Sequence, residues 1–371
     1  MTRYAHYVGS LPADLMTGDR AVLQWFADRT AGRPVTALPC DLDPDWIMDY
    51  LRTRKQHSDV FEIVRDGGYA DYGDFPSYGL RSGRKLETKH VSMDRAERID
   101  AVVTAFESLQ RERPELAQTK VQISLPNPLD LAMFVFAGAA VSGGLPTGKA
   151  LRHYDLTVAA LRQLPVFTEA MVQEVSEVVA RHGDRVVWQL ESPIALLSMV
   201  KATQLGSRWA LAPLVARQLA GVLGRLHEIG AETVVHLCYG DYQHKSMLSP
   251  RGLTPAVALL NRTARLLDRQ GVQLPPVHVP CAHGAEPAPL EPRFYAPLRS
   301  LAPDWRVIAG VVSTDSVENS NRARALFEEA LGRNAFGVAT ACGLGRCTPE
   351  VARHAAEATV AVAGAVEQTS E

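Results

Sequence analysis

The stretch Thr233-Val-Val-His236-Leu-Cys238-Tyr-Gly-Asp241 decides how the rest of the chain is interpreted. It begins as an apolar run of strand composition and ends in two metal-capable side chains that are separated by one residue. Because side chains alternate between the two faces of a strand, His236 and Cys238 would project together. A second apolar run, Phe336-Gly-Val-Ala-Thr340, is followed closely by Cys342.

If both runs are strands of one parallel barrel, His236, Cys238 and Cys342 meet at its carboxyl end, where such barrels carry their chemistry. An imidazole with thiolates is a ligand set that zinc prefers, and fewer than four protein ligands leave a coordination position for a substrate. A buried cysteine is more commonly a small apolar side chain, and a buried histidine a hydrogen-bonded core residue. The spacing alone leaves both interpretations open.

The order of strand-like and helical segments predicts the fold. Eight short apolar runs, each followed by helical sequence, give the count of a (β/α)8 barrel. We expect strands at 4–8, 35–38, 121–125, 185–190, 233–238, 276–279, 307–313 and 336–340. The 371 residues are many for one domain, but barrels with insertions reach this length. We therefore predict an α/β fold, a (β/α)8 TIM barrel in a single domain over 1–371, with insertions after strands 2 and 3.

Two stretches inside the expected insertions need their own interpretation. Residues 66–90 are polar but hold several aromatic side chains, and loops of this length are commonly functional, so we predict an active-site lid. Residues 143–149, Gly-Gly-Leu-Pro-Thr-Gly-Lys, match the spacing of a phosphate-binding loop. The next residue is Ala150, where Ser or Thr would hold magnesium in a phosphate-binding loop. We therefore interpret this stretch as a turn that follows an apolar segment. Helices are expected after it, at 150–163 and 168–182.

The composition excludes several classes of protein. A hydrophobic content of 46%, a charged content of 22% and a net charge of −2 are typical of a soluble globular protein without an electrostatic footprint for nucleic acid. No apolar stretch reaches the roughly 18 residues of a membrane span, and the first residues lack a signal-peptide core. Five widely spaced cysteines do not resemble a disulfide framework, so we expect a cytoplasmic protein with reduced thiols, as a monomer or a homodimer, with neither nucleic acid nor membrane as a partner.

Four motifs, in chain order, resemble those of cobalamin-independent methionine synthase, in its catalytic carboxyl-terminal domain, and of its zinc-dependent relatives. These relatives include epoxyalkane–coenzyme M transferases and share a superfamily with uroporphyrinogen decarboxylase. The motifs are Val8-Gly-Ser10-Leu-Pro12, similar to Gly-Ser-Phe-Pro; Gln189-Leu-Glu191-Ser-Pro193, similar to Gln-Ile-Asp-Glu-Pro; His236-Leu-Cys238-Tyr, similar to the His-x-Cys metal motif; and Cys342-Gly-Leu-Gly-Arg346, similar to the segment with the last zinc ligand. The pattern spans nearly the whole chain.

The resemblance implies a zinc enzyme that activates a homocysteine-like thiol as a thiolate for attack on an alkyl donor. It implies that Ser10 and Glu191 bind the amino-acid end of the thiol, and we expect Glu191 to be a catalytic residue as well. The partners would be a small-molecule thiol and an alkyl donor, with methyltetrahydrofolate as a candidate.

The resemblance also implies a carboxylate zinc ligand after strand six, and no carboxylate lies at that strand end. Cys281 is the first choice for the replacement, because a thiolate is a strong zinc ligand. His278, His283, Glu286 and water stay open as alternatives.

Two departures concern the alkyl donor. The family's strand seven ends with a histidine that donates a proton, whereas this chain has Val311-Val-Ser313-Thr-Asp315-Ser316. Asp315 could act as that acid if burial raised its pKa. The folate-associated Thr-Gly-Pro is replaced by Ser124-Leu-Pro-Asn127. We therefore expect the zinc–thiol half of the chemistry and leave the donor open.

Three other functions compete with this hypothesis. The first is zinc-dependent addition of a thiol to an epoxide-like electrophile, with Arg346 binding the sulfonate of the substrate. A metal-free decarboxylase is disfavoured, because it would leave His236, Cys238 and Cys342 without a role. The third is a metal-binding or scaffold protein with a degenerate donor site.

Overall fold

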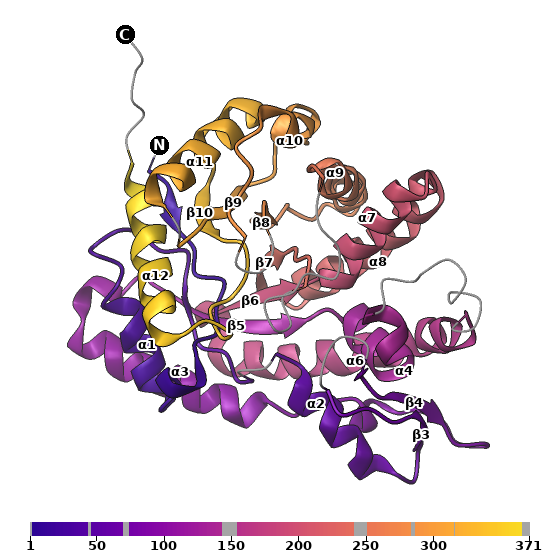
Figure 1. Cartoon of the computed structure of the whole chain (residues 1–371). Coiled ribbons are helices and arrows are strands. Elements are labelled where there is room, and N and C mark those ends of the chain that lie inside the picture. The colour runs from indigo at the N-terminus through magenta and orange to yellow at the C-terminus, as the bar shows by residue number, and fades with distance from the viewer. Residues whose placement is uncertain are drawn as a thin grey trace.

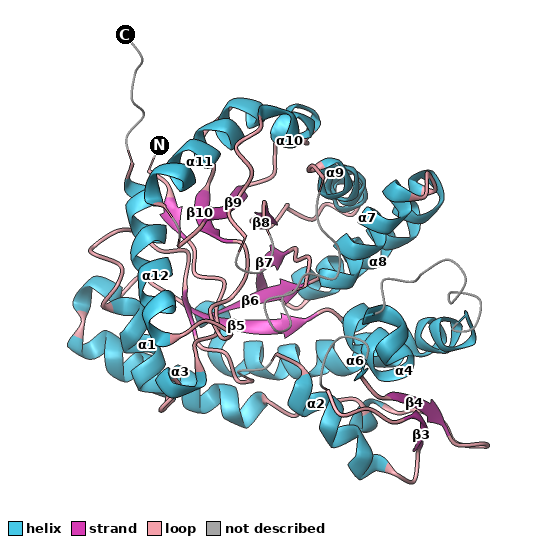
Figure 2. Ribbon diagram, viewed as in Figure 1, coloured by secondary structure: helices cyan, strands magenta, loops and turns pink. Residues whose placement is uncertain are grey.

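The computed structural model describes residues 2–43, 46–69, 74–142, 154–240, 251–282, 286–314 and 316–365. Eight parallel strands follow one another around a central axis, and helices surround them (Figures 1 and 2). The order of the strands in the sheet is β1-β10-β9-β8-β7-β6-β5-β2. Their bounds are β1 Tyr4–Ala5, β2 Leu38–Pro39, β5 Val121–Pro126, β6 Val186–Glu191, β7 Glu232–His236, β8 Val277–Pro280, β9 Val307–Val312 and β10 Gly337–Thr340.

A parallel bridge between Ala5 and Val35 closes the ring. The Ala5 N–H donates to the carbonyl of Pro34 at 3.0 Å, and the Thr36 N–H donates to the carbonyl of Ala5 at 3.1 Å. These bonds join β1 to the segment that leads into β2, so the first and last strands of the order meet. The predicted (β/α)8 barrel is confirmed.

The helices that cover the barrel bury one face each. In α9, for example, Leu259, Leu260 and Leu267 are buried, whereas Arg265 is exposed. Helix α11 starts at a Ser316 cap whose side chain accepts from the Asn319 N–H. The covering helices are α1 Asp19–Ala27, α3 Ala96–Glu112, α7 Pro193–Gln204, α8 Arg208–Glu228, α9 Thr254–Arg269, α10 Pro292–Tyr295, α11 Val317–Leu331 and α12 Pro349–Gly364. No described helix is both long and apolar enough to cross a membrane.

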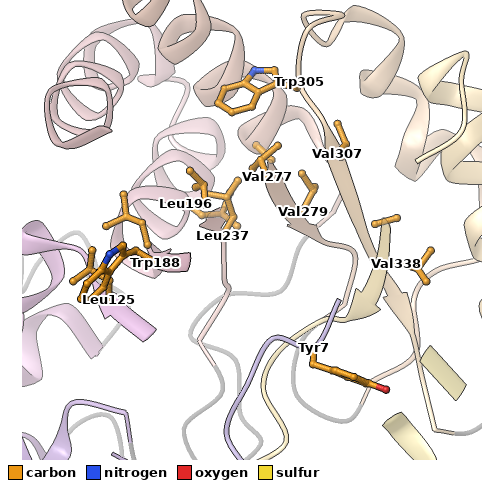
Figure 3. Close-up of a cluster of buried hydrophobic side chains, with 14 of the residues drawn as sticks. Tyr7, Leu125, Trp188, Leu196, Leu237, Val277, Val279, Trp305, Val307 and Val338 are labelled. Carbon is orange, nitrogen blue, oxygen red and sulfur yellow. The ribbon is translucent and has the colours of Figure 1, made fainter. Parts of the chain in front are cut away.

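Strand alternation divides the core into two layers. Outward-facing side chains such as Trp188, Val277, Val307 and Val338 pack between the sheet and the helices (Figure 3). The other face of the strands fills the barrel. An apolar interior layer consists of Val8, Ala37, Val187, Val234, Ile308 and Ala339. Two residues further on, β6 and β7 place the polar side chains of Gln189 and His236 on the same face.

Two insertions build a second hydrophobic core beside the barrel. The first contains α2 (Met48–Thr53) and a hairpin of β3 (Phe61–Arg65) and β4 (Ser77–Leu80). The second contains α4 (Pro128–Ser142) and α6 (Tyr154–His182). Figure 1 shows the hairpin next to α2 and α4, on the side away from α11 and α12.

The insertions differ from the sequence prediction in two respects. The stretch 66–90 is not one loop, because it contains β4 and a short turn of helix at Thr88–His90. The two helices expected at 150–163 and 168–182 are one helix, α6, which continues through Pro165. A proline inside a helix removes one hydrogen bond and crowds the preceding turn, but the residues on either side of Pro165 pack in one hydrophobic cluster with α4. The stretch 143–149 lies outside the described residues.

Candidate metal and substrate site

Strand β7 delivers His236 and Cys238 to the inside of the barrel. Both side chains are buried, with exposed fractions of 3% and 7%. Val235, Leu237 and Tyr239 belong to the outer core, so the alternation predicted for this stretch continues past the end of the strand.

The loop after β10 is bound to the loop after β1, and this arrangement sets the position of Cys342. The Leu344 N–H donates to the Gly9 carbonyl, and the Gly345 N–H donates to Ser10 Oγ, each at 3.0 Å. Gly343 has no room for a side chain, because a Cβ there would lie 2.5 Å from Ser10 Oγ. Ser10 itself has a φ of +46°, a conformation that non-glycine residues rarely adopt.

His236, Cys238 and Cys342 form one group whose candidate ligand atoms all lie within 4.8 Å of one another. The two sulfur atoms are 3.6 Å apart. Two thiolates at about 2.3 Å from a tetrahedral zinc are separated by about 3.8 Å, whereas a disulfide requires about 2.05 Å. The donor set and its spacing therefore fit zinc. Within the described ranges, no other group of three His, Cys, Asp or Glu side chains has this geometry.

The surroundings of Cys238 favour its thiolate form. The hydrogen bond with Cys342 lowers the pKa of the Cys238 thiol well below its ordinary value, and His236 and the Gly240 N–H add to this effect against the opposing effect of burial. The Gly240 N–H lies 3.3 Å from Cys238 Sγ. His236 Nδ1 is buried and has no hydrogen-bond partner. A metal binds a ring nitrogen that is free of other partners, and it binds cysteine sulfur as the thiolate.

Two carboxylates lie close to this group. Burial raises the pKa of Glu191, and His236, Ser124 and Gln189 partly offset that rise. Desolvation, followed by the charge of Glu191, raises the pKa of Asp41 to about 8. Asp41 Oδ1 is buried without a hydrogen-bond partner.

Asp41 has no role in the sequence analysis. It belongs to none of the four motifs, although it follows β2 at the carboxyl edge of the barrel. Position at a strand end was the one signal that could have identified it.

A pocket with about 780 Å³ of empty space, including solvent at its mouth, opens above the group. Ser10, Glu191 and Arg346, the candidates for substrate binding from the sequence, are among the residues that line it. The polar part of the lining includes the three acidic side chains of Asp41, Asp43 and Glu191. The apolar lining consists of Val8, Trp46, Met48, Phe75, Phe134 and Pro193. Phe75 comes from the stretch predicted as a lid.

The structure does not bring Cys281 to the metal group. Cys281 belongs to the outer core with Val277 and Val279, and its sulfur contacts the Val279 carbonyl at 3.7 Å. The parity of the strand explains this placement, since residues two apart share a face. Burial raises the pKa of the Cys281 thiol far above its ordinary range.

Of the alternatives for a fourth ligand, His278 and Glu286 do not join the group in the described part of the chain. His278 stacks on His236, with ring centroids 4.7 Å apart, and its Nε2 lies 3.0 Å from the Thr340 carbonyl. Glu286 is exposed. His283 and the expected acid Asp315 lie outside the described residues.

The interior polar layer supports the group from below. His6 Nε2 lies 3.2 Å from Gln189 Oε1, and His6 Nδ1 lies 2.7 Å from Thr36 Oγ1. Gln189 Nε2 donates to the Val8 carbonyl and to Glu191 Oε1. Because this fixes Gln189 Oε1 as an acceptor, His6 is the neutral tautomer with a proton on Nε2. The network orients the Glu191 carboxylate toward the pocket.

The fold is similar to those of two solved structures. One is a B12-independent methionine synthase from Shewanella sp. W3-18-1 in complex with selenomethionine, with a TM-score of 0.54, 14% identity, and coverage of 98% of this chain and 97% of the other. The second is a methyltransferase from Methanosarcina mazei, with a TM-score of 0.53, 15% identity, and coverage of 98% and 93%. No protein-family model matches the sequence, and no curated protein matches it. At these identities the likeness establishes a shared fold.

Proposed function

We propose that this protein is a zinc-dependent alkyltransferase that transfers a methyl or related alkyl group to the sulfur of a small thiol. The observation that carries the proposal is the group of His236, Cys238 and Cys342 at the floor of a pocket. The group supplies three ligands, so one position of a four-coordinate zinc remains for a substrate.

His236, Cys238 and Cys342 would hold the ion. When bound, zinc would keep an incoming thiol in its thiolate form at neutral pH, which is the nucleophilic form. The folded chain already holds the two sulfur ligands and the imidazole close together. The low pKa of Cys238 reduces the cost of deprotonating one of these ligands.

Glu191 and Asp41 would bind an ammonium group of the thiol substrate. The charge of Glu191 raises the pKa of Asp41, so a cation placed beside the two carboxyl groups relieves that repulsion. Arg346, from the loop that carries Cys342, would bind the substrate carboxylate, and the Ser10 hydroxyl would add a hydrogen bond. An amino-acid thiol of the homocysteine type fits this arrangement.

The two similar structures agree with this class of reaction, since one is a methionine synthase and the other a methyltransferase. Addition of a thiol to an epoxide-like electrophile, with a substrate that carries a sulfonate, is less favoured. Three carboxylates and one arginine line the pocket, so its charge opposes a sulfonate.

The test has two stages. Protein purified without chelator should contain about one zinc per chain by elemental analysis. Homocysteine and a panel of methyl donors, including methyltetrahydrofolate, should then give methionine, which mass spectrometry detects. Absence of zinc would contradict the metal site, and bound zinc without turnover of any donor would favour a scaffold protein instead.

A further inference from the structure

The apolar wall of the pocket is built from aromatic rings. Phe134 lies at its centre, with the Trp46 ring 5.5 Å away at 88° and the Phe75 ring 5.7 Å away at 51°. Phe75 and Phe134 are each 1% exposed, so they hold the wall in place, and Trp46 is half-buried. The three residues come from two different insertions, so the wall exists only in the folded chain.

Trp46 is held in a conformation that costs energy. Its φ is +68°, in the left-handed region that bulky residues avoid. Strained residues of this kind cluster at ligand-binding sites, where the surrounding structure keeps them in place. The Trp46 Nε1 atom is buried without a hydrogen-bond partner, so no hydrogen bond from the indole holds the ring in place.

The pocket also has more acidic than basic side chains. Asp41, Asp43 and Glu191 line it against Arg346 alone among the described residues. A cation that binds beside Asp41, whose pKa is raised to about 8, favours the charged form of that carboxyl group. A divalent ion held by two thiolates would add no net charge to the pocket, because the charges of the ion and of the two thiolates cancel. Trp46 and Asp43 also line a neighbouring hollow, whose empty space is about 1100 Å³, so the aromatic side of the pocket extends beyond the room needed for the thiol.

We infer that the alkyl donor is an onium compound, a methylsulfonium or a quaternary methylammonium, whose cationic centre binds against Trp46 and beside Asp43. The inference rests on the function proposed above. Onium groups bind to aromatic faces by cation–π attraction, and carboxylates add Coulombic attraction. The combination of an aromatic wall with surplus carboxylates selects such a cation over an uncharged donor.

The chemistry balances without a proton donor for the leaving group. The thiol loses its proton to solvent, its sulfur forms a bond to the methyl carbon, and the bond from that carbon to the onium atom breaks. The electron pair of the broken bond neutralises the onium atom, so a sulfide or an amine leaves uncharged. A sulfide or an amine leaves without drawing a proton from Asp41 or Glu191, the two lining carboxyl groups whose pKa is raised. Both carboxyl groups then remain available to bind the cationic ends of the substrates.

Calorimetric titration of the zinc-loaded protein tests the binding. Choline and trimethylsulfonium should bind on the order of ten-fold more tightly than 3,3-dimethyl-1-butanol, the uncharged isostere of choline. Trp46→Leu should remove this preference and Trp46→Phe should restore part of it. Trp209→Leu is the matched control, since Trp209 is 76% exposed and lies outside the pocket. Equal affinity for choline and its isostere overturns the inference.

Turnover identifies the donor. Homocysteine is incubated with dimethylsulfonioacetate, with glycine betaine or with methyltetrahydrofolate. Product from the sulfonium or from the ammonium donor supports the inference and distinguishes the two. Product from methyltetrahydrofolate alone overturns the inference and leaves the proposed transferase intact. Failure of all donors together with absence of zinc contradicts the proposed function itself.

Discussion

The sulfur atoms of Cys238 and Cys342 lie 3.6 Å apart, although 104 residues separate them in the sequence. Their strands β7 and β10 are not neighbours, because β8 and β9 lie between them in the sheet. The loop after β10 therefore crosses toward the barrel axis, where its bonds to Gly9 and Ser10 hold it. The metal group depends on this loop as much as on the strands.

Loss of either thiolate should abolish zinc binding. We expect Cys238→Ser and Cys342→Ser each to lower zinc affinity by more than the roughly 10–100-fold that follows loss of an outer hydrogen bond to a ligand. Competition with a chromogenic zinc chelator measures this change. Unchanged affinity in either variant would contradict the proposed ligand set.

Cys281→Ala is the matched control for these variants. Cys281 is fully buried in the outer core, so its removal should lower the free energy of unfolding without changing zinc affinity. A large loss of zinc affinity in a folded Cys281→Ala protein would return this residue to the list of candidate ligands.

Gly343→Ala tests the loop contact. The added Cβ would lie 2.5 Å from Ser10 Oγ and 2.7 Å from the Gly9 carbonyl oxygen, so one loop must move. Because Cys342 precedes this position, zinc affinity should fall although no ligand has changed. Gly221→Ala, inside α8 where nothing lies within 4 Å of the new Cβ, should leave affinity as it is. Equal zinc affinities in the two variants would show that the contact between the loops does not affect zinc binding.

The sequence predicts the barrel well, because its strands are short apolar runs with helices between them. All eight expected strands are present, with ends that differ by a few residues, and the alternation at His236 and Cys238 holds. The local composition was sufficient there, because strands that are buried on both faces are nearly continuous apolar runs.

The parts that the sequence did not predict depend on contacts between distant segments. The hairpin is one such part: β4 lies inside the stretch predicted as a loop, and the sequence predicts no element at Phe61–Arg65, which has one buried residue followed by four exposed ones. Asp41 gained importance only when folding placed it beside Glu191. For Cys281, similarity of chemistry suggested a ligand, whereas strand parity turned it to the other face.

Glu191 should discriminate between thiols by their ammonium group. Glu191→Gln removes the negative charge and keeps the shape, so KM for homocysteine should rise on the order of ten-fold, the loss expected for one charge-assisted hydrogen bond. KM for 4-mercaptobutyrate, which lacks the ammonium, should change little. Steady-state kinetics with both thiols makes the comparison. Equal effects on both would assign Glu191 to another role, and Asp41→Asn should show the same pattern as Glu191→Gln if the two carboxylates act together.

His6 should make the fold sensitive to acid. Burial, followed by the charge of His236, lowers the pKa of His6 from 6.5 to about 3. The unfolded chain therefore binds a proton near pH 6.5 that the folded chain excludes, so the stabilising contribution is present above that pH and is lost as pH falls toward 3. Between pH 6.5 and 5 this loss amounts to about 2 kcal/mol, from about 1.36 kcal/mol for each pH unit. Urea denaturation of chelator-treated protein across this range measures it.

A pair of variants assigns that pH dependence to His6. His6→Gln should be less stable at pH 7, because its contacts with Thr36 and Gln189 change, but its stability should fall less steeply toward pH 5. His354→Gln replaces an exposed ring on α12, which is in contact with water in both the folded and the unfolded chain, so it should keep the wild-type slope. Because His278 is also buried and its pKa is lowered well below its ordinary value, part of the slope should remain in His6→Gln. An unchanged slope in His6→Gln would show that this ring does not limit the stability of the barrel in acid.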